Sequence, residues 1–185
     1  MGIALADAAA DLGAEVVLVT GPVNINPRNN SIKIVKIQNA EEMASECISN
    51  FPWCDIAILS AAVADFTPVR TEKEKLKRGE ETITLTLRPT VDIAGSLGKM
   101  KKKSQILAGF ALETSNEIKN ATGKLHKKNL DLIVLNSLRD EGAGFEHDTN
   151  RITIIDKYNN IDKFELKSKE DAARDILGKI VSMIK

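Results

Sequence analysis

The chain has 185 residues, of which 43% are hydrophobic, which is enough for one α/β domain with a core and short for two. Its 26 lysines and arginines balance its 26 aspartates and glutamates, so it lacks the net positive field that non-specific nucleic-acid binding requires. Aromatic residues make up only 4% of the chain, which disfavours a stacking platform for single-stranded nucleic acid. We therefore expect no nucleic-acid partner.

Nothing in the sequence predicts a membrane span or an export signal. The longest nearly continuous apolar run, residues 56–64, is about half of the ~20 residues that a spanning helix needs. The apolar residues near the N-terminus are periodic and follow no basic segment. Cys47 and Cys54 lack the spacing of a disulfide framework or a metal site, and we interpret both as reduced thiols in a cytoplasmic protein.

The first third of the sequence alternates helical and strand patterns. Leu5, Ala8 and Leu12 fall on one helical face, and Gly13 favours a stop directly after them. Residues 16–19 form an unbroken apolar run, as in a strand that is covered on both faces. The predicted elements are a helix that ends at residue 12, strands at 16–19 and 32–37, a helix at 40–49 and a strand at 55–62.

A charged segment separates these elements from the rest. Residues 72–81 are dense in charge, which predicts a solvated loop, and residues 82–87 alternate Thr with Ile or Leu, as a half-buried strand does. Residues 168–171 resemble a capping box at the start of a closing helix. The other predicted elements are strands at 105–111 and 130–135 around a helix at 113–128, and a hairpin of 151–156 and 161–166.

This order predicts an α/β fold with a doubly wound, mostly parallel, Rossmann-like sheet, an antiparallel strand and a C-terminal hairpin plus helix. Such sheets bind ligands beyond the carboxyl ends of their strands. They usually begin with a strand and a glycine-rich turn, whereas this sequence begins at the helix. The motif Gly-x-Gly-x-x-Gly does not occur, which disfavours a Rossmann oxidoreductase.

Two segments near the predicted strand ends carry residues suited to anion chemistry. Residues 61–65 combine small side chains with one carboxylate, and they either line a ligand or end a core strand. Residues 75–78 hold three cations in four positions. They form either a mobile loop that closes over a phosphate or a solvated charge run.

Two lysines and one aromatic residue are further candidates. Lys124 and Lys128 share a helical face, where a triphosphate would offset their repulsion; alternatively, they are solvated lysines near a helix C-terminus. Phe110 either packs in the core or contacts a base. His126 and His147 have no nearby ligand pattern and receive no role.

Together, these motifs resemble bacterial phosphopantothenate–cysteine ligase, the synthetase half of the bifunctional flavoprotein of coenzyme A biosynthesis. The similarity is collinear over essentially the whole chain. It is carried by residues 1–8, 13–16 with 20–22, 61–66 (Ala-Ala-Val-Ala-Asp-Phe), 75–78 (Lys-Leu-Lys-Arg), 109–114, 128–131 and 144–145.

The resemblance implies a single ligase domain over residues 1–185 with a flexible basic loop at about 70–81. It implies a cytoplasmic homodimer that joins 4′-phosphopantothenate to cysteine through an acyl-cytidylate, with CTP as substrate and Mg²⁺ as cofactor. Lys75 would stabilise charge at the α-phosphate, and Ala61 and Ala62 would line the intermediate site. No protein metal ligand is assigned. The residues implied around the nucleotide are Leu59, Ser60, Ala61, Asp65, Lys75, Val91, Asp92, Ile93, Ala94, Phe110, Lys124 and Lys128.

The sequence departs from the family pattern at several points. Arg78 stands where the family usually has Lys, and Val91 stands where it more often has Pro. The family's opening strand, its Gly-x-Thr turn and an Asn-Arg-Ser-Ser-Gly-Lys stretch would be expected before Met1, as would the flavin-binding decarboxylase half. The alternative function is therefore a catalytically incomplete module for nucleotide binding or dimerisation.

Overall fold

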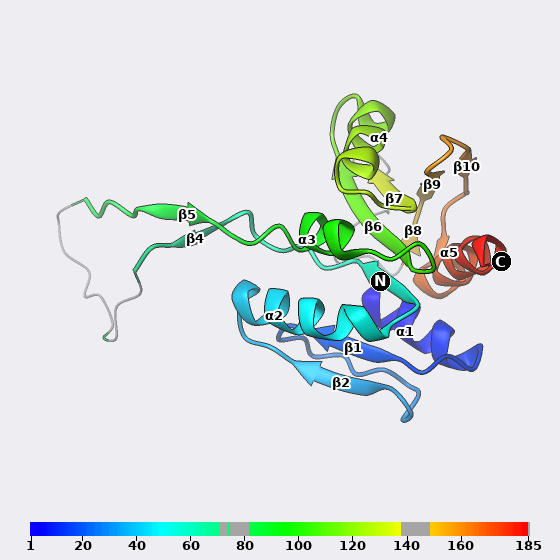
Figure 1. The fold of residues 1–185 in the computed structure, drawn as a ribbon, viewed down its shortest axis with the longest axis horizontal. Helices are drawn as coiled ribbons and strands as arrows, with labels where there is room; N and C mark the ends of the chain where they lie inside the picture. The colour runs from blue at the N-terminus through cyan, green and yellow to red at the C-terminus, as the bar shows by residue number, and fades with distance from the viewer. Residues whose placement is uncertain (71–73, 75–81, 138–148, 185) are drawn as a thin grey trace.

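The computed structural model describes residues 1–70, 74, 82–137 and 149–184. The predicted basic loop at about 70–81, apart from Arg70 and Glu74, lies outside the described residues, as does the motif at 144–145. Figure 1 shows a globular body that contains both termini and an arm that leaves it.

The centre of the body is a five-stranded sheet in the order β10-β9-β7-β6-β3. β3, β6 and β7 run parallel, with Leu59 opposite Gly109 and Phe110 opposite Val134, whereas β9 pairs antiparallel with β7 and with β10. The strands are β3 (Ile56–Leu59), β6 (Ile106–Glu113), β7 (Leu132–Ser137), β9 (Ile152–Asp156) and β10 (Ile161–Lys163). This sheet confirms the predicted α/β class, with parallel strands at its centre and a C-terminal hairpin.

A second sheet lies beside the first. β1 (Val17–Thr20) and β2 (Lys33–Lys36) form a two-stranded parallel sheet of their own, followed by α2 (Ala40–Asn50) and a 3₁₀ turn, η1 (Phe51–Trp53). Within the described residues β1 and β3 are therefore both edge strands. The prediction that residues 16–19 are covered on both faces is wrong for the start of β1, because Val17 is exposed.

Helices pack on both faces of the central sheet. α1 (Gly2–Asp11) and α5 (Lys169–Met183) contact each other and share a hydrophobic cluster with Ala108 and Val134. On the other face, α2, α3 (Ile93–Met100) and α4 (Glu117–Lys127) share a second cluster with Leu107 and Ile133. Adjacent residues of one strand thus face different helix layers, as the alternation of a pleated sheet requires.

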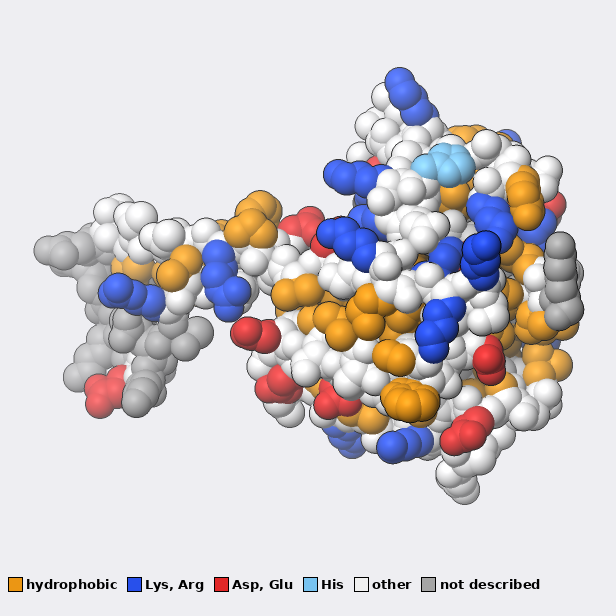
Figure 2. All heavy atoms as spheres, in the orientation of Figure 1, with side chains coloured by type: hydrophobic (Ala, Val, Ile, Leu, Met, Phe, Trp, Pro, Cys, Tyr) orange, Lys and Arg blue, Asp and Glu red, His pale blue; other side chains and the backbone are white. Residues whose placement is uncertain are grey.

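The arm is the main departure from the predicted elements. β4 (Phe66–Pro68) and β5 (Leu87–Pro89) pair antiparallel and extend away from the body (Figure 1). Residues 82–87 were predicted to be a half-buried strand, but Ile83 and Leu85 are exposed, because this stretch lies along the arm rather than on the core. Figure 2 shows hydrophobic side chains on the surface of this arm.

The remaining elements are short or agree with the sequence patterns. β8 (Thr149–Asn150) pairs with β11 (Lys167–Ser168) in a small antiparallel sheet. The turn between β9 and β10 places Asn159 at a positive φ of 65°. In the described part of the chain, no helix is long and apolar enough to cross a membrane.

Candidate functional site

Thr90, two residues before Asp92 at the start of α3, makes two hydrogen bonds to the end of the loop that follows β3. The Thr90 backbone N–H donates to the Asp65 carbonyl at 2.9 Å, and the Thr90 hydroxyl donates to the Ala64 carbonyl at 2.7 Å. Residues 64–65 therefore lie beside residue 90 at the base of the arm, and Leu59 shares a hydrophobic cluster with Ile93 and Ala94, which brings the segments 59–65 and 91–94 together. Most of the residues predicted to surround a nucleotide belong to these two segments.

The helix α1 begins close to the same edge. A Cβ placed on Gly2 would lie 2.8 Å from the Ser60 hydroxyl, so the first turn of α1 approaches the end of β3 closely. Met1 is the N-cap of α1 and makes no side-chain cap hydrogen bond. Backbone N–H groups of a first helical turn attract anions.

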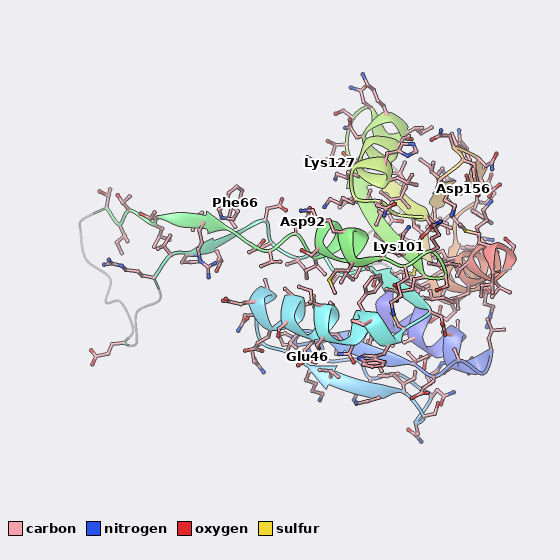
Figure 3. The ribbon with its side chains drawn as sticks, viewed as in Figure 1. Glu46, Phe66, Asp92, Lys101, Lys127 and Asp156 are labelled. Atoms are coloured by element: carbon pink, nitrogen blue, oxygen red, sulfur yellow. The ribbon has the colours of Figure 1, made fainter. Side chains whose placement is uncertain are left out.

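Asp92 links the start of α3 to the end of α4. Its side chain caps α3 by accepting from the Gly95 N–H at 3.0 Å, and the Lys128 ammonium donates to the same carboxylate at 3.0 Å. Burial raises the pKa of Asp92, but these two donors outweigh burial and hold the pKa below its usual 3.8. The carboxylate is therefore ionised at neutral pH. Figure 3 labels Asp92 where the arm joins α3.

Lys124 is also paired with a carboxylate. Its ammonium lies 2.7 Å from Glu113, the last residue of β6, whose side chain is largely buried whereas that of Lys124 is about half exposed. Each of the two lysines is thus paired with a carboxylate, Lys124 with Glu113 and Lys128 with Asp92. An anion that bound to these lysines would share them with Glu113 and Asp92 or replace those partners.

Other predicted site residues lie elsewhere or contribute differently. The Phe110 side chain packs with the cluster beneath α1 and α5, on the opposite face of the sheet from α4. The Ile93 side chain is buried in the cluster with Leu97, so only its backbone can face a ligand at this helix start. Lys75 lies outside the described residues.

Three contributors were missed by sequence reasoning. Thr90, Glu113 and Gly95 had no assigned role, although Asp92 followed by Gly95 has the spacing of a helix N-cap and could have indicated α3. The pairing of Glu113 with Lys124 had no usable signal, because they belong to different elements eleven positions apart in the sequence.

The family resemblance implies that Mg²⁺ acts together with CTP, without an assigned protein ligand. The described residues contain no group of three or more His, Cys, Asp or Glu side chains placed to hold a metal ion. Mg²⁺ commonly keeps several waters and binds substrate phosphates with one or two carboxylates.

A hollow of about 250 Å³ lies beyond the carboxyl ends of β1 and β2. It is lined by Thr20, Gly21, Pro22, Lys36 and the loop that follows β1, and none of the predicted site residues lines it. The loop is anchored by buried Asp7, which accepts from the backbone N–H groups of Arg28 and Asn29 at 2.8 and 3.0 Å. This hollow is a different place from the Asp92–Lys128 site.

Comparison with known proteins gives one family. The DNA/pantothenate metabolism flavoprotein C-terminal domain matches residues 1–184. The crystal structure of the C-terminal domain of the coenzyme A biosynthesis bifunctional protein CoaBC superposes with a TM-score of 0.81 and 38% identity, covering 98% of this chain and 82% of that one.

Two curated relatives carry different names. A cysteine/cysteine sulfinic acid decarboxylase from an unknown prokaryotic organism is 61% identical over 184 residues, covering all of this chain and 51% of that protein. The bifunctional protein CoaBC of Bacillus subtilis is 43% identical over 185 residues, covering all of this chain and 45% of that protein. The chain thus spans about half the length of the curated relatives it matches.

Proposed function

The chain belongs to the DNA/pantothenate metabolism flavoprotein C-terminal domain family, and we propose from this that it is the ligase domain of coenzyme A biosynthesis, acting in the cytoplasm. The proposed reaction joins 4′-phosphopantothenate to cysteine with consumption of CTP. The observation that carries the proposal is the convergence of residues 59–65, residues 91–94 and Lys128 at one edge of the sheet.

The proposed reaction has two steps. The carboxylate oxygen of 4′-phosphopantothenate attacks the α-phosphorus of CTP, and pyrophosphate leaves with the electron pair of the broken P–O bond. The cysteine amine then attacks the acyl carbon, loses a proton and expels CMP. Such chemistry depends mainly on positioning and on cations that stabilise developing negative charge.

The proposed roles of the residues follow from the resemblance to the ligase family. Lys124 and Lys128 bind the phosphates, Lys75 stabilises the charge on the α-phosphate, and Ala61 and Ala62 leave room for the acyl-cytidylate. Mg²⁺ supplies further charge neutralisation on the phosphates. The other proposed nucleotide contacts are Leu59, Ser60, Asp65, Val91, Asp92, Ala94 and the backbone of Ile93, whereas the Phe110 side chain, which packs beneath α1 and α5, is left out of this set.

The alternative is a module that binds a nucleotide or a second copy without completing the reaction. Its support is that β1 and β3 are both edge strands within the described residues, so that each could pair with a strand of another copy. On this alternative, the 185 residues bind CTP but form no product. The two proposals are separated by whether the protein releases pyrophosphate and forms the ligated product or only binds CTP.

The test measures pyrophosphate release by the protein with CTP, 4′-phosphopantothenate and cysteine. Lys128→Gln and Lys124→Gln each remove one phosphate contact, and we expect the KM for CTP to rise about tenfold. Lys75→Gln should abolish turnover and leave the fold intact. The matched control is Lys119→Gln, an exposed lysine of the same helix α4, which should leave the KM unchanged.

Two outcomes would contradict the proposal. One is unchanged kinetics in all three lysine variants. The other is release of CO₂ from cysteine or cysteine sulfinic acid without pyrophosphate, which would favour the activity named for the 61% identical relative.

We also propose that the chain forms a homodimer through the arm. Phe66, Ile83, Leu85 and Leu87 are all more than half exposed on it, and isolated hairpins gain little stability by themselves. A second copy would cover these side chains.

A further inference from the structure

One helix contacts both ends of Lys128. At its N-terminus, α3 presents Asp92, which accepts from the Lys128 ammonium at 3.0 Å. Near its C-terminus, Gly98 lies so close to the backbone of Lys128 that an added Cβ would overlap the Lys128 carbonyl oxygen. The lysine side chain therefore runs back along α3 from a fixed backbone to a fixed carboxylate.

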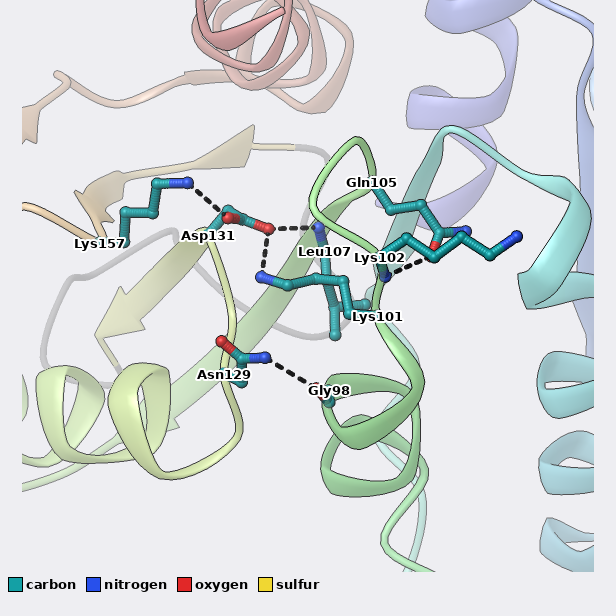
Figure 4. A network of polar contacts seen from close by, with 8 residues as sticks. All are labelled: Gly98, Lys101, Lys102, Gln105, Leu107, Asn129, Asp131 and Lys157. Atoms are coloured by element: carbon teal, nitrogen blue, oxygen red, sulfur yellow. Dashed lines mark hydrogen bonds and ion pairs between the residues drawn. The ribbon is translucent and has the colours of Figure 1, made fainter.

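The residue that follows Lys128 fixes the turn between α4 and β7, which we call the α4–β7 turn. Asn129 has a positive φ of 52°, and its side-chain amide donates to the Gly98 carbonyl at 2.8 Å. This hydrogen bond also satisfies a carbonyl in the last turn of α3, where intrahelical partners end. Figure 4 shows the contact between Asn129 and Gly98 at the end of the helix.

An ion cluster centred on the buried Asp131 attaches the α4–β7 turn to the sheet. Asp131 accepts from the Lys101 ammonium at 2.7 Å, from the Leu107 N–H at 2.9 Å and from the Lys157 ammonium at 2.9 Å (Figure 4). Lys101 directly follows α3, and Asp131 directly precedes β7. The end of α3 and the turn after α4 are therefore attached to the same point of the sheet.

Gly98 differs from two other helical glycines of the chain. A Cβ on Gly123 in α4 or on Gly178 in α5 would meet nothing within 4 Å. At Gly98, by contrast, a side chain would have to push α3 away from the backbone of Lys128, since a carbonyl cannot rotate aside as the end of a flexible side chain can. The absence of a side chain at position 98 therefore allows α3 to lie close to the backbone of Lys128 in the α4–β7 turn.

We propose that Gly98, with Asn129, is a positioning residue that sets the orientation of Lys128 for the phosphates of the nucleotide. This inference rests on the proposed function and deepens it. Gly98 acts through the Lys128 backbone, and Asp92 holds the side chain of that lysine before the nucleotide binds. A shift of α3 would change the angle at which the ammonium meets a phosphate, to which charge-assisted hydrogen bonds are sensitive.

The test uses the protein and calorimetric binding of CTP and of cytidine, which lacks phosphates. We expect Gly98→Ala to weaken CTP binding about tenfold, because a displaced Lys128 ammonium would make a poorly aligned and therefore weaker charge-assisted hydrogen bond to a phosphate. Cytidine binding should not change. The matched control, Gly123→Ala, should leave both affinities unchanged.

A second variant guards against a folding defect. Asn129→Gly keeps the left-handed backbone accessible and removes only the hydrogen bond to Gly98. We expect a smaller loss of CTP affinity with the same selectivity over cytidine, and a circular dichroism spectrum like that of the unmodified protein.

A double-mutant cycle separates this inference from the proposed function. If Gly98 acts through Lys128, then Gly98→Ala should have no further effect on CTP binding in the Lys128→Gln background. Full additivity, or equal losses for CTP and cytidine, would overturn the positioning role while leaving the ligase proposal standing. If the unmodified polypeptide fails to bind CTP at all, both are overturned.

Discussion

Asp131 shows how one residue can hold several elements in place. It is only 3% exposed, and it accepts hydrogen bonds from two lysines and one backbone N–H. Burial raises the pKa of Asp131, but these donors more than offset burial, so the pKa lies below its usual 3.8. The residue is therefore a buried anion at neutral pH, matched by a Lys101 side chain that is itself 10% exposed.

We expect Asp131→Asn to lower the free energy of unfolding by about 3 kcal/mol at neutral pH, because the substitution leaves Lys101 buried without its counter-charge. A group whose pKa is depressed by folding stabilises the protein above its unfolded pKa, here 3.8, and loses that contribution as the pH falls through the folded pKa. The difference in the free energy of unfolding between Asp131→Asn and the unmodified protein should therefore become smaller as the pH falls below about 3.8.

Urea unfolding curves at a series of pH values check this prediction. Glu165→Gln serves as the control, because Glu165 is 95% exposed and lies 3.8 Å from Arg151 in a surface ion pair that contributes little. A penalty for Asp131→Asn that stays constant from neutral to strongly acidic pH would contradict the assignment.

Among the helices, α5 begins with the side-chain N-cap that the sequence predicted at residues 168–171. Ser168 is its N-cap and accepts from the Asp171 N–H at 3.0 Å. We expect Ser168→Ala to lower the free energy of unfolding by about 1 kcal/mol, because one N–H of the first turn loses its partner. The measurement is the midpoint of the urea unfolding curve, compared at an unchanged dependence of the free energy of unfolding on urea concentration. Ser182→Ala, near the exposed end of α5, should change the midpoint much less, and equal shifts in both variants would refute the cap.

Other elements could not be predicted from local patterns. α3 was missed because Gly95 and Gly98 lower helix propensity within a helix of eight residues, and both glycines are there for contacts with Asp92 and Lys128 that a sequence does not display. The pattern of residues 82–87 suggested a half-buried strand because alternation indicates two different faces, but it does not say what covers them. In the arm, nothing in the body covers them.

At the scale of the whole molecule, the long apolar runs were sufficient to predict the sheet and its class, because a parallel sheet buried on both faces requires them. In the candidate site, Lys128 contacts Asp92 and Lys124 contacts Glu113, whereas the Phe110 side chain packs with the layer of α1 and α5. The roles of these residues in binding a nucleotide stay predictions. Side-chain partners across elements depend on packing, which local patterns do not contain. The role of Lys75 stays a prediction.

The arm leads to a prediction about assembly. Leu85 is 65% exposed on it, and an exposed row of large apolar side chains is unfavourable in water unless a partner covers it. If that partner is a second copy, Leu85→Asp places a charge in the shared interface and should convert a dimer to a monomer, with little change in the thermal unfolding of the body.

Analytical ultracentrifugation over a range of protein concentrations measures this change. Leu12→Asp is the matched control, because Leu12 is 68% exposed at the end of α1, in the body rather than on the arm, and this variant should remain dimeric. Because the base of the arm is joined through Thr90 to the loop after β3, and Asp92 follows directly, a dimer held by the arm would also restrain the start of α3. We therefore expect Leu85→Asp to weaken CTP binding as well. A protein that is monomeric without substitution, or one that stays dimeric with Leu85→Asp, would contradict a dimer held by the arm.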